Sequence, residues 1–191
     1  MKYLVFLLEE PSAKEMLKGI LPKIISPEIT IKYIIFEGKQ DLEKQIINKL
    51  NYWKIAETYF IVMRDQDSAD CKDVKQNLIN KIKQTKKADQ CIVRIACHEL
   101  ESFYLGDLEA VENGLKMKNI SKLQNNKKFK NPDRLANAAQ ELKKLTSLNY
   151  QKISGSRAIA PFLNISGENK SKSFNVLLNG IRTLLNNKAE S

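Results

Sequence analysis

Acidic residues follow two apolar runs of the sequence. Glu9 and Glu10 follow the run 3–8, and Asp65-Gln66-Asp67 follows another run that begins at Tyr59. Continuous apolar runs of this length are typical of buried parallel strands, whose carboxyl ends meet at the edge of the sheet where open α/β proteins bind ligands. Carboxylates gathered there repel one another unless a cation neutralises them. The pattern therefore predicts a site for Mg²⁺ or Mn²⁺, which prefer oxygen ligands.

A third acidic pair, Glu99 and Glu101, lies just beyond the apolar run 91–96. Residues two apart on a helix point about 200° apart, so we expect only one of the two carboxylates to reach the ion. The alternative for either residue is a favourable charge at a helix N-terminus, which contributes about 0.3–1 kcal/mol.

Two basic residues close to glycines are the candidates for contacting a phosphate. Lys39 follows Gly38, and Arg157 lies in the segment 155–157, which we expect to form a turn. Backbone N–H groups beside a glycine can approach an anion, and a guanidinium binds phosphate through two parallel hydrogen bonds. Phosphodiester hydrolysis needs such cations to neutralise charge on the phosphoryl oxygens. An ordinary turn with a solvated charge remains the alternative.

The spacing of apolar residues predicts a βαβαβαβ order for the first part of the chain. We expect strands at 3–8, 29–36, 58–63 and 91–96, and helices at 11–21, 40–50 and 70–82. This order indicates an α/β fold with a mostly parallel four-stranded sheet flanked by helices.

The remainder of the chain contains no further strand of comparable strength. We expect helices at 98–105, 107–115, 132–145 and 173–187, a polar stretch at 116–131 and a structured loop at 151–164. The predicted organisation is an α/β core at residues 1–115 and a basic, mainly helical extension at residues 116–191 that packs on the core.

The net charge of +10 lies entirely in the last part of the chain. Residues 1–115 carry 17 Lys and Arg against 18 Asp and Glu, whereas residues 116–191 carry 15 against 4. A basic segment beside a carboxylate cluster suits a polyanion such as nucleic acid, which one part holds while the other reacts with it. The alternative is a solvated, Lys-rich surface that reflects biased composition.

Other features narrow the class of protein. No apolar run approaches the roughly 20 residues that span a bilayer, and the apolar start is too short for a signal peptide. The three cysteines show no CxxC spacing, which favours reduced thiols and a cytoplasmic location. His98 is the only histidine, so a zinc site is disfavoured.

Longer segments carry a family resemblance. The segment Leu8-Glu9-Glu10-Pro11-Ser12 is similar to the glutamate motif that opens Toprim domains, and Asp65-Gln66-Asp67 resembles their DxD motif. Residues 36–42, 99–107 and 154–161 extend the likeness, so that nearly the whole chain resembles the Toprim-like domain-of-unknown-function 4276 family.

The resemblance implies roles for individual residues. Toprim proteins include topoisomerases, primases, recombination proteins and nucleases of the overcoming-lysogenization-defect type, which share Mg²⁺-dependent phosphoryl chemistry on nucleic acid. By this likeness Glu9 is the general acid/base, Asp65 and Asp67 are metal ligands, and Glu101 or Glu99 is an added ligand.

One departure concerns the essential glutamate. The Toprim glutamate is commonly followed by glycine, whereas Glu10 stands in that place here. A charged side chain restricts close backbone approach, so the choice between Glu9 and Glu10 stays open.

The leading hypothesis is a Mg²⁺-dependent nuclease. The resemblance implies an ATPase partner and a role as the effector of a bacterial anti-phage defence system. The alternative is a non-hydrolytic regulatory or nucleic-acid-binding module that uses the same acidic edge. The sequence leaves open DNA or RNA as the target, one metal or two, the restraint on the activity, and the oligomeric state, with a homo-oligomer among the alternatives.

Overall fold

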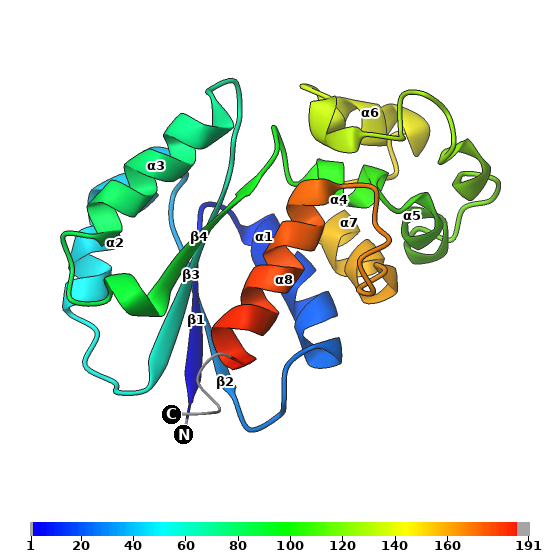
Figure 1. The fold of residues 1–191 in the computed structure, drawn as a ribbon. Coiled ribbons are helices and arrows are strands. Elements are labelled where there is room, and N and C mark those ends of the chain that lie inside the picture. Colours follow the sequence, from blue (N-terminus) through cyan, green and yellow to red (C-terminus); the bar gives the residue numbers. More distant parts are fainter. Residues whose placement is uncertain (1, 187–191) are drawn as a thin grey trace.

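The computed structural model describes residues 2–186, which form a parallel sheet between two layers of helices (Figure 1). The strands are β1 (Tyr3–Leu8), β2 (Thr30–Ile35), β3 (Thr58–Asp65) and β4 (Cys91–Ala96). Their order is β2-β1-β3-β4, and every neighbouring pair is parallel. The predicted α/β fold with a four-stranded parallel sheet is therefore confirmed.

The register brings the carboxyl ends of the central strands to the same level. Leu8 at the end of β1 lies opposite Met63 of β3, and Asp65 at the end of β3 lies opposite Ala96 at the end of β4. All eight residues of β3 are buried, because this strand has a neighbour on each side and helices on both faces.

Two sets of helices cover the two faces of the sheet. One face carries α2 (Lys39–Asn51) and α3 (Cys71–Ile82), and the other carries α1 (Pro11–Ile20) and α8 (Lys172–Asn186) (Figure 1). Beyond α1 lie the shorter helices α4 (Glu101–Leu105), α5 (Leu108–Gly114), α6 (Ala138–Leu145) and α7 (Lys152–Ile159). Five 3₁₀ turns link these elements: Leu21–Lys23, Ala88–Gln90, Ser121–Leu123, Pro132–Arg134 and Ala160–Phe162.

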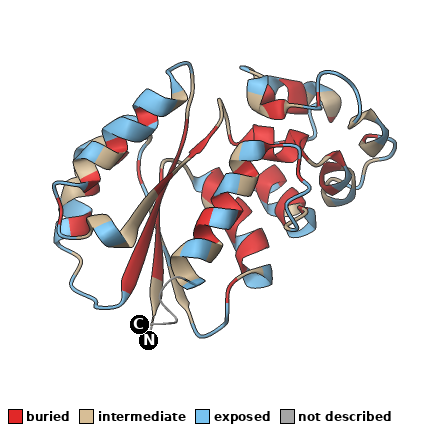
Figure 2. Ribbon diagram, viewed as in Figure 1, coloured by how far each residue is buried: buried red, intermediate tan, exposed pale blue. Residues whose placement is uncertain are grey.

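Alternating side chains of the strands divide the core into two parts. Residues Leu4, Phe6 and Leu8 of β1 pack with α1, α4 and α8, whereas Val5 and Leu7 pack with α2 and α3. Figure 2 shows the buried residues along the strands and on the inner sides of the helices.

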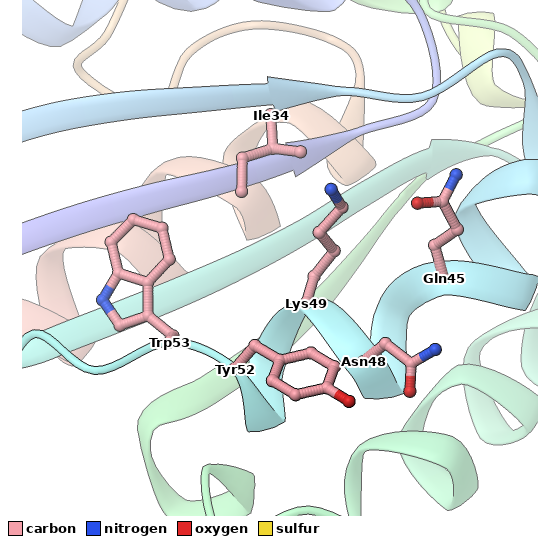
Figure 3. A pocket seen from close by; sticks show the side chains of 6 residues that line it. All are labelled: Ile34, Gln45, Asn48, Lys49, Tyr52 and Trp53. Atoms are coloured by element: carbon pink, nitrogen blue, oxygen red, sulfur yellow. The ribbon is translucent and has the colours of Figure 1, made fainter.

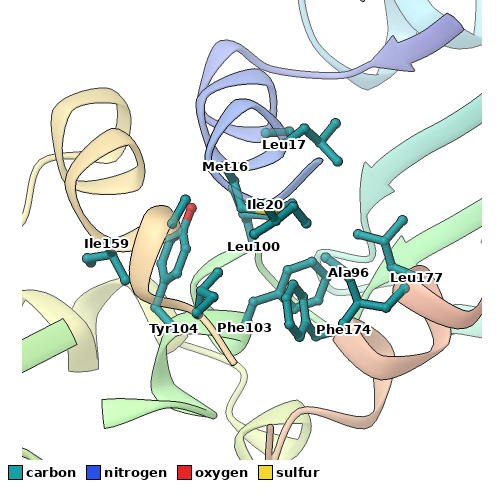
Figure 4. Packing of buried hydrophobic residues seen from close by; sticks show 14 of the residues in the cluster. Met16, Leu17, Ile20, Ala96, Leu100, Phe103, Tyr104, Ile159, Phe174 and Leu177 are labelled. Carbon is teal, nitrogen blue, oxygen red and sulfur yellow. The ribbon is translucent and has the colours of Figure 1, made fainter. Parts of the chain in front are cut away.

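The larger part of the core joins the sheet to the helical extension. Figure 4 shows Met16 and Ile20 of α1 close to Leu100, and the rings of Phe103 and Phe174 in contact at 5.1 Å between centroids. Each fully buried apolar side chain of this size contributes roughly 1.5–3 kcal/mol relative to an exposed one. The packing of α8 on β4 thus fixes the last helix against the sheet.

The loop predicted at 151–164 is wrong, because most of this segment is helical. Helix α7 covers Lys152–Ile159. A Cβ at Gly155 would lie 2.4 Å from the ring of Tyr150, so this glycine permits close packing of an aromatic ring instead of a turn.

Three predicted boundaries also differ from the structure. Strand β3 continues to Asp65, two residues beyond its predicted end, and α4 begins only at Glu101, since His98 has a φ of 57°. The helix predicted at 132–145 is divided into a 3₁₀ turn and α6, and residue 187 lies outside the described residues. Among residues 2–186, no helix has both the length and the apolar character needed to cross a membrane.

Candidate functional site

The acidic residues that follow β1 and β3 meet at the carboxyl edge of the sheet. The backbone N–H of Asp65 donates a hydrogen bond to Oε2 of Glu9 at 3.1 Å. This contact follows from the topology, because β1 and β3 are neighbours whose ends lie level. The expected proximity of Glu9 and Asp65 is therefore confirmed.

Strand alternation divides the charged residues at this edge between the two faces of the sheet. Asp65 comes two residues after Met63 and lies on the face covered by α1, where its closest charges include Glu10 and Glu101. Arg64 lies on the opposite face and pairs with Glu43 of α2 at 2.6 Å.

Asp65 is the centre of the first group of charges. The residue is 9% exposed. Burial, together with the negative charges of Glu10, Glu101 and Glu9, raises the pKa of Asp65 well above its usual value, and a backbone hydrogen bond from Leu100 opposes the shift. Four carboxylates therefore form one region of excess negative charge.

Glu101 is fully buried within this group. Its Oε1 accepts a hydrogen bond from the hydroxyl of Tyr150 at 2.9 Å, whereas its Oε2 is buried without a hydrogen-bond partner among the described residues. Burial raises the pKa of the Glu101 carboxyl, although the cation Lys152 opposes the shift. An unpaired carboxylate oxygen in the interior is costly, and a proton or a bound cation would remove that cost.

Lys152 is the cation of the first group. Its Nζ lies 3.0 Å from Oε2 of Glu10, whose other oxygen accepts a hydrogen bond from Ser12. Burial alone would lower the pKa of Lys152, but the carboxylates of Glu10 and Glu101 outweigh burial and raise it. Lys152 thus remains charged and neutralises part of the acidic group.

The second group lies on the face covered by α2. Lys39, the first residue of that helix, pairs with Asp67 at 2.8 Å, and Nη2 of Arg64 lies 3.5 Å from the same carboxylate. The positive φ of Gly38, 91°, directs the chain into α2 and places Lys39 at the edge of the sheet. An open cavity of about 290 Å³ lies beside Lys39, Arg64 and Asp67.

Glu9 is the member of the first group that also contacts the second. Its Oε2 is 3.7 Å from Nε of Arg64 and also accepts the hydrogen bond from Asp65. Burial raises the pKa of Glu9, and the contacts with Asp65 and Arg64 only partly offset this effect. A carboxyl group with a raised pKa at a partly open edge is suited to proton transfer.

Two candidate residues lie away from the carboxylates. Oε2 of Glu99 accepts a hydrogen bond from the backbone N–H of Ala139 at 2.8 Å, so Glu99 caps the start of α6. Nε of Arg157 donates to Oε2 of Glu15 on α1 at 2.6 Å. Glu101, and not Glu99, is the member of its pair that joins Asp65.

The donor chemistry of the first group fits a hard divalent cation. Asp65, Glu9, Glu10 and Glu101 offer only oxygen atoms as ligands, and Oε2 of Glu101 accepts no hydrogen bond from residues 2–186. As the side chains are placed, however, the described part of the chain contains no group of three His, Cys, Asp or Glu residues arranged to hold a metal ion. Lys152 contacts Glu10, one of the four carboxylates.

Arg64, Tyr150 and Lys152 belong to the site, although no motif of the sequence points to them. Arg64 carried a signal, because an arginine that interrupts an apolar strand next to an aspartate is unusual for a buried strand. Tyr150 and Lys152 carried no such signal, because Tyr150 directly precedes the segment predicted as a loop and Lys152 lies within it.

A second cavity, of about 390 Å³, lies away from these carboxylates. It is formed where the end of α2 packs near β2, and Figure 3 shows Lys49, Tyr52 and Trp53 around it. No acidic side chain lines this cavity, so it does not extend the carboxylate site.

Fold and site together define a parallel α/β protein with a cluster of carboxylates at the ligand-binding edge of its sheet. The chain belongs to the family described as a domain of unknown function (DUF4276), whose model matches residues 8–182. Comparison with curated proteins and with solved structures finds no match.

Proposed function

We propose that this protein is a Mg²⁺-dependent nuclease of Toprim type that hydrolyses phosphodiester bonds of nucleic acid. The observation that carries the proposal is the group of Asp65, Glu9, Glu10 and Glu101 at the carboxyl edge of the sheet. Burial of like charges at this position is unfavourable for the fold, which supports a functional reason for their presence.

Each residue of the site has a separate role in the proposed hydrolysis. A Mg²⁺ or Mn²⁺ ion at this site would supply Lewis acidity and make a water molecule a better nucleophile at neutral pH. Asp65 and Glu101 would hold that cation, with Glu10 beside them. Glu9, whose pKa is raised by burial, transfers protons. Lys39 is 48% exposed at the rim and meets the phosphate oxygens.

Asp67 and Arg64 act on Lys39 and Glu9. Asp67 holds Lys39 through the 2.8 Å ion pair, and Arg64 orients Glu9 from a position that is only 5% exposed. Neither residue needs to touch the metal. Asp67 is therefore proposed as a positioning residue, in contrast to the ligand role that the Toprim likeness implies.

The charge distribution supports nucleic acid as the substrate. Residues 116–191 carry 15 basic residues against 4 acidic ones, which suits contacts with a phosphate backbone. By the Toprim likeness we further propose that the protein acts in the cytoplasm with an ATPase partner as an anti-phage effector.

Cleavage of DNA and RNA by the purified full chain tests the proposal. With Mg²⁺ or Mn²⁺, the wild type should cut at least one of the two, and Asp65→Asn should lose about 100-fold or more in rate, since a ligand to the metal is gone. The matched control is Asp89→Asn, an exposed aspartate at the opposite end of the sheet, which should retain the wild-type rate.

Two results would contradict the proposal. Equal cleavage by wild type and Asp65→Asn would remove the carboxylates from the reaction. Salt-dependent binding of nucleic acid without any metal-dependent cleavage would favour the non-hydrolytic module. In that module the ion pairs of Lys39 and Lys152 would neutralise Asp67 and Glu10 in place of a metal ion.

A further inference from the structure

A third cavity lies along the outer edge of β4. This strand ends the order β2-β1-β3-β4, so one of its sides has no neighbouring strand among residues 2–186. The cavity, of about 440 Å³, is bounded by the first turns of α3 and α8 and by the segment 131–134. Its volume is in the range of small-molecule sites, roughly 300–1,000 Å³.

Basic residues make up most of the charged residues that line this cavity. Lys75, Arg94, Arg134 and Lys172 line it, and Asp133 is the acidic residue among the lining side chains. Asp133 accepts hydrogen bonds from the hydroxyl of Ser171 at 2.6 Å and from the backbone N–H of Ser173 at 2.8 Å. Both carboxylate oxygens of Asp133 therefore already accept hydrogen bonds at the start of α8.

None of the four basic residues forms an ion pair with a carboxylate of residues 2–186. The cavity consequently holds positive charge that the described part of the chain does not neutralise. Cations gathered in one concave site attract an anion, and they suit one with more than one negative charge.

Arg94 is fixed in position by α8. Its Nε donates to the carbonyl of Val176 at 3.1 Å, and its Nη1 donates to the carbonyl of Val93 at 2.8 Å. A Cβ at Gly180 would lie 2.2 Å from Nη2, so glycine provides the space that the guanidinium occupies. Burial lowers the pKa of Arg94, a cost that a bound anion would offset.

Apolar side chains also line the cavity. Val93 and Ile95 of β4 are buried beside it, and Val176 of α8 is 51% exposed. A ligand that matches the whole cavity therefore combines an anionic group with an apolar or aromatic body.

We propose that this cavity binds a phosphate ester of about mononucleotide size. Arg94, Arg134 and Lys172 hold the phosphate, because several cations suit a dianion and the guanidinium of Arg134 offers forked donors. Val93, Ile95 and Val176 contact the organic part. The site is distinct from the carboxylate group and does not depend on the proposed nuclease activity.

Isothermal titration calorimetry of the full chain with adenosine monophosphate and with phenyl phosphate, in EDTA, tests this assignment. At least one of the two should bind, whereas adenosine should bind at least about tenfold more weakly, about 1.4 kcal/mol, because it lacks the charge. Arg134→Gln/Lys172→Gln should weaken binding at least about tenfold, since it removes two exposed cations from the wall.

Matched controls separate this effect from general changes of charge. Lys127→Gln/Lys130→Gln removes two exposed cations elsewhere in the basic part and should change affinity by less than about twofold. Gly180→Ala should weaken binding because its methyl group displaces the guanidinium of Arg94. Asp65→Asn should bind like wild type, so that failure of the nuclease proposal leaves this result unaffected.

Three outcomes would overturn the assignment. The first is that neither phosphate ester binds at about 1 mM. The second is that the two double variants bind the phosphate ester with the same affinity. The third is that an oligonucleotide binds while both phosphate esters fail to bind. The last result would show that the basic residues serve a nucleic-acid backbone and not a small ligand.

Discussion

Replacing Asp65 by asparagine removes a negative charge from the buried edge of the sheet while it preserves the shape of the side chain. Asp65 is 9% exposed, and burial followed by the charges of Glu10, Glu101 and Glu9 makes its ionised form unfavourable. The amide oxygen can still accept the hydrogen bond from Leu100. We therefore expect the Asp65→Asn fold to be more stable than the wild type at pH 7 without metal.

The size of this gain follows from the balance of charge. Relief of an unfavourable functional charge typically contributes about 0.5–2 kcal/mol to the free energy of unfolding. For a chain of this length, 1 kcal/mol raises Tm by about 2–4 °C. Urea or thermal unfolding in EDTA measures the difference, and Asp89→Asn, an exposed residue, should remain within about 0.5 kcal/mol of wild type.

The pH dependence gives a further check on the sign. Because the pKa of Asp65 in the folded state lies well above the ordinary value of 3.8, the folded state binds the proton more tightly than the unfolded chain. The associated stability is fully present below about 3.8 and is lost as the pH rises through the folded-state pKa. The advantage of Asp65→Asn should thus be largest at neutral pH and should disappear toward pH 4.

A lower stability of Asp65→Asn than of wild type at pH 7 in EDTA would contradict this prediction. That result would mean that a cation of the protein already compensates the charge of Asp65. A stability gain that persisted unchanged to low pH would also contradict it, because the effect would then come from packing and not from charge.

Other substitutions test the supporting contacts. Tyr150→Phe should cost about 1–3 kcal/mol in urea unfolding, since the buried carboxylate of Glu101 then loses the hydrogen bond from the Tyr150 hydroxyl; an unchanged midpoint would argue against that contact. Lys39→Gln should alter stability by less than about 1 kcal/mol, because its pair with Asp67 is exposed, yet it should slow cleavage. Gly19→Ala should cost about 1–3 kcal/mol in thermal unfolding, since the new Cβ would lie 2.5 Å from the Cβ of Ala160.

The meeting of Glu9 with Asp65 was predictable because two rules suffice for it. Apolar runs predict the strands, and parallel strands bring their carboxyl ends to one edge. Alternation along a strand also explains why Asp65 and Arg64 face opposite sides. Which helices cover each face requires the structure, so the partners Glu43 and Lys152 could not be assigned.

The contacts made by the C-terminal helices could not be predicted from the sequence for a different reason. Gly155 resembles a turn residue, yet it is a helix position where the ring of Tyr150 occupies the space of a side chain. Glu99 caps a helix that begins 39 residues later, and no local pattern records that contact. Tertiary packing, and not local propensity, decides both cases.

The proposed function requires that the carboxylates around Asp65 bind a divalent cation. Anomalous diffraction from a crystal soaked in Mn²⁺ tests this binding, because the signal locates the bound ion. We predict a peak about 2–2.6 Å from an oxygen of Asp65, with a second oxygen from Glu9, Glu10 or Glu101 at similar distance, and no such peak in Asp65→Asn. Wild-type crystals saturated with Mn²⁺ that show no peak among these carboxylates would contradict the proposed metal site.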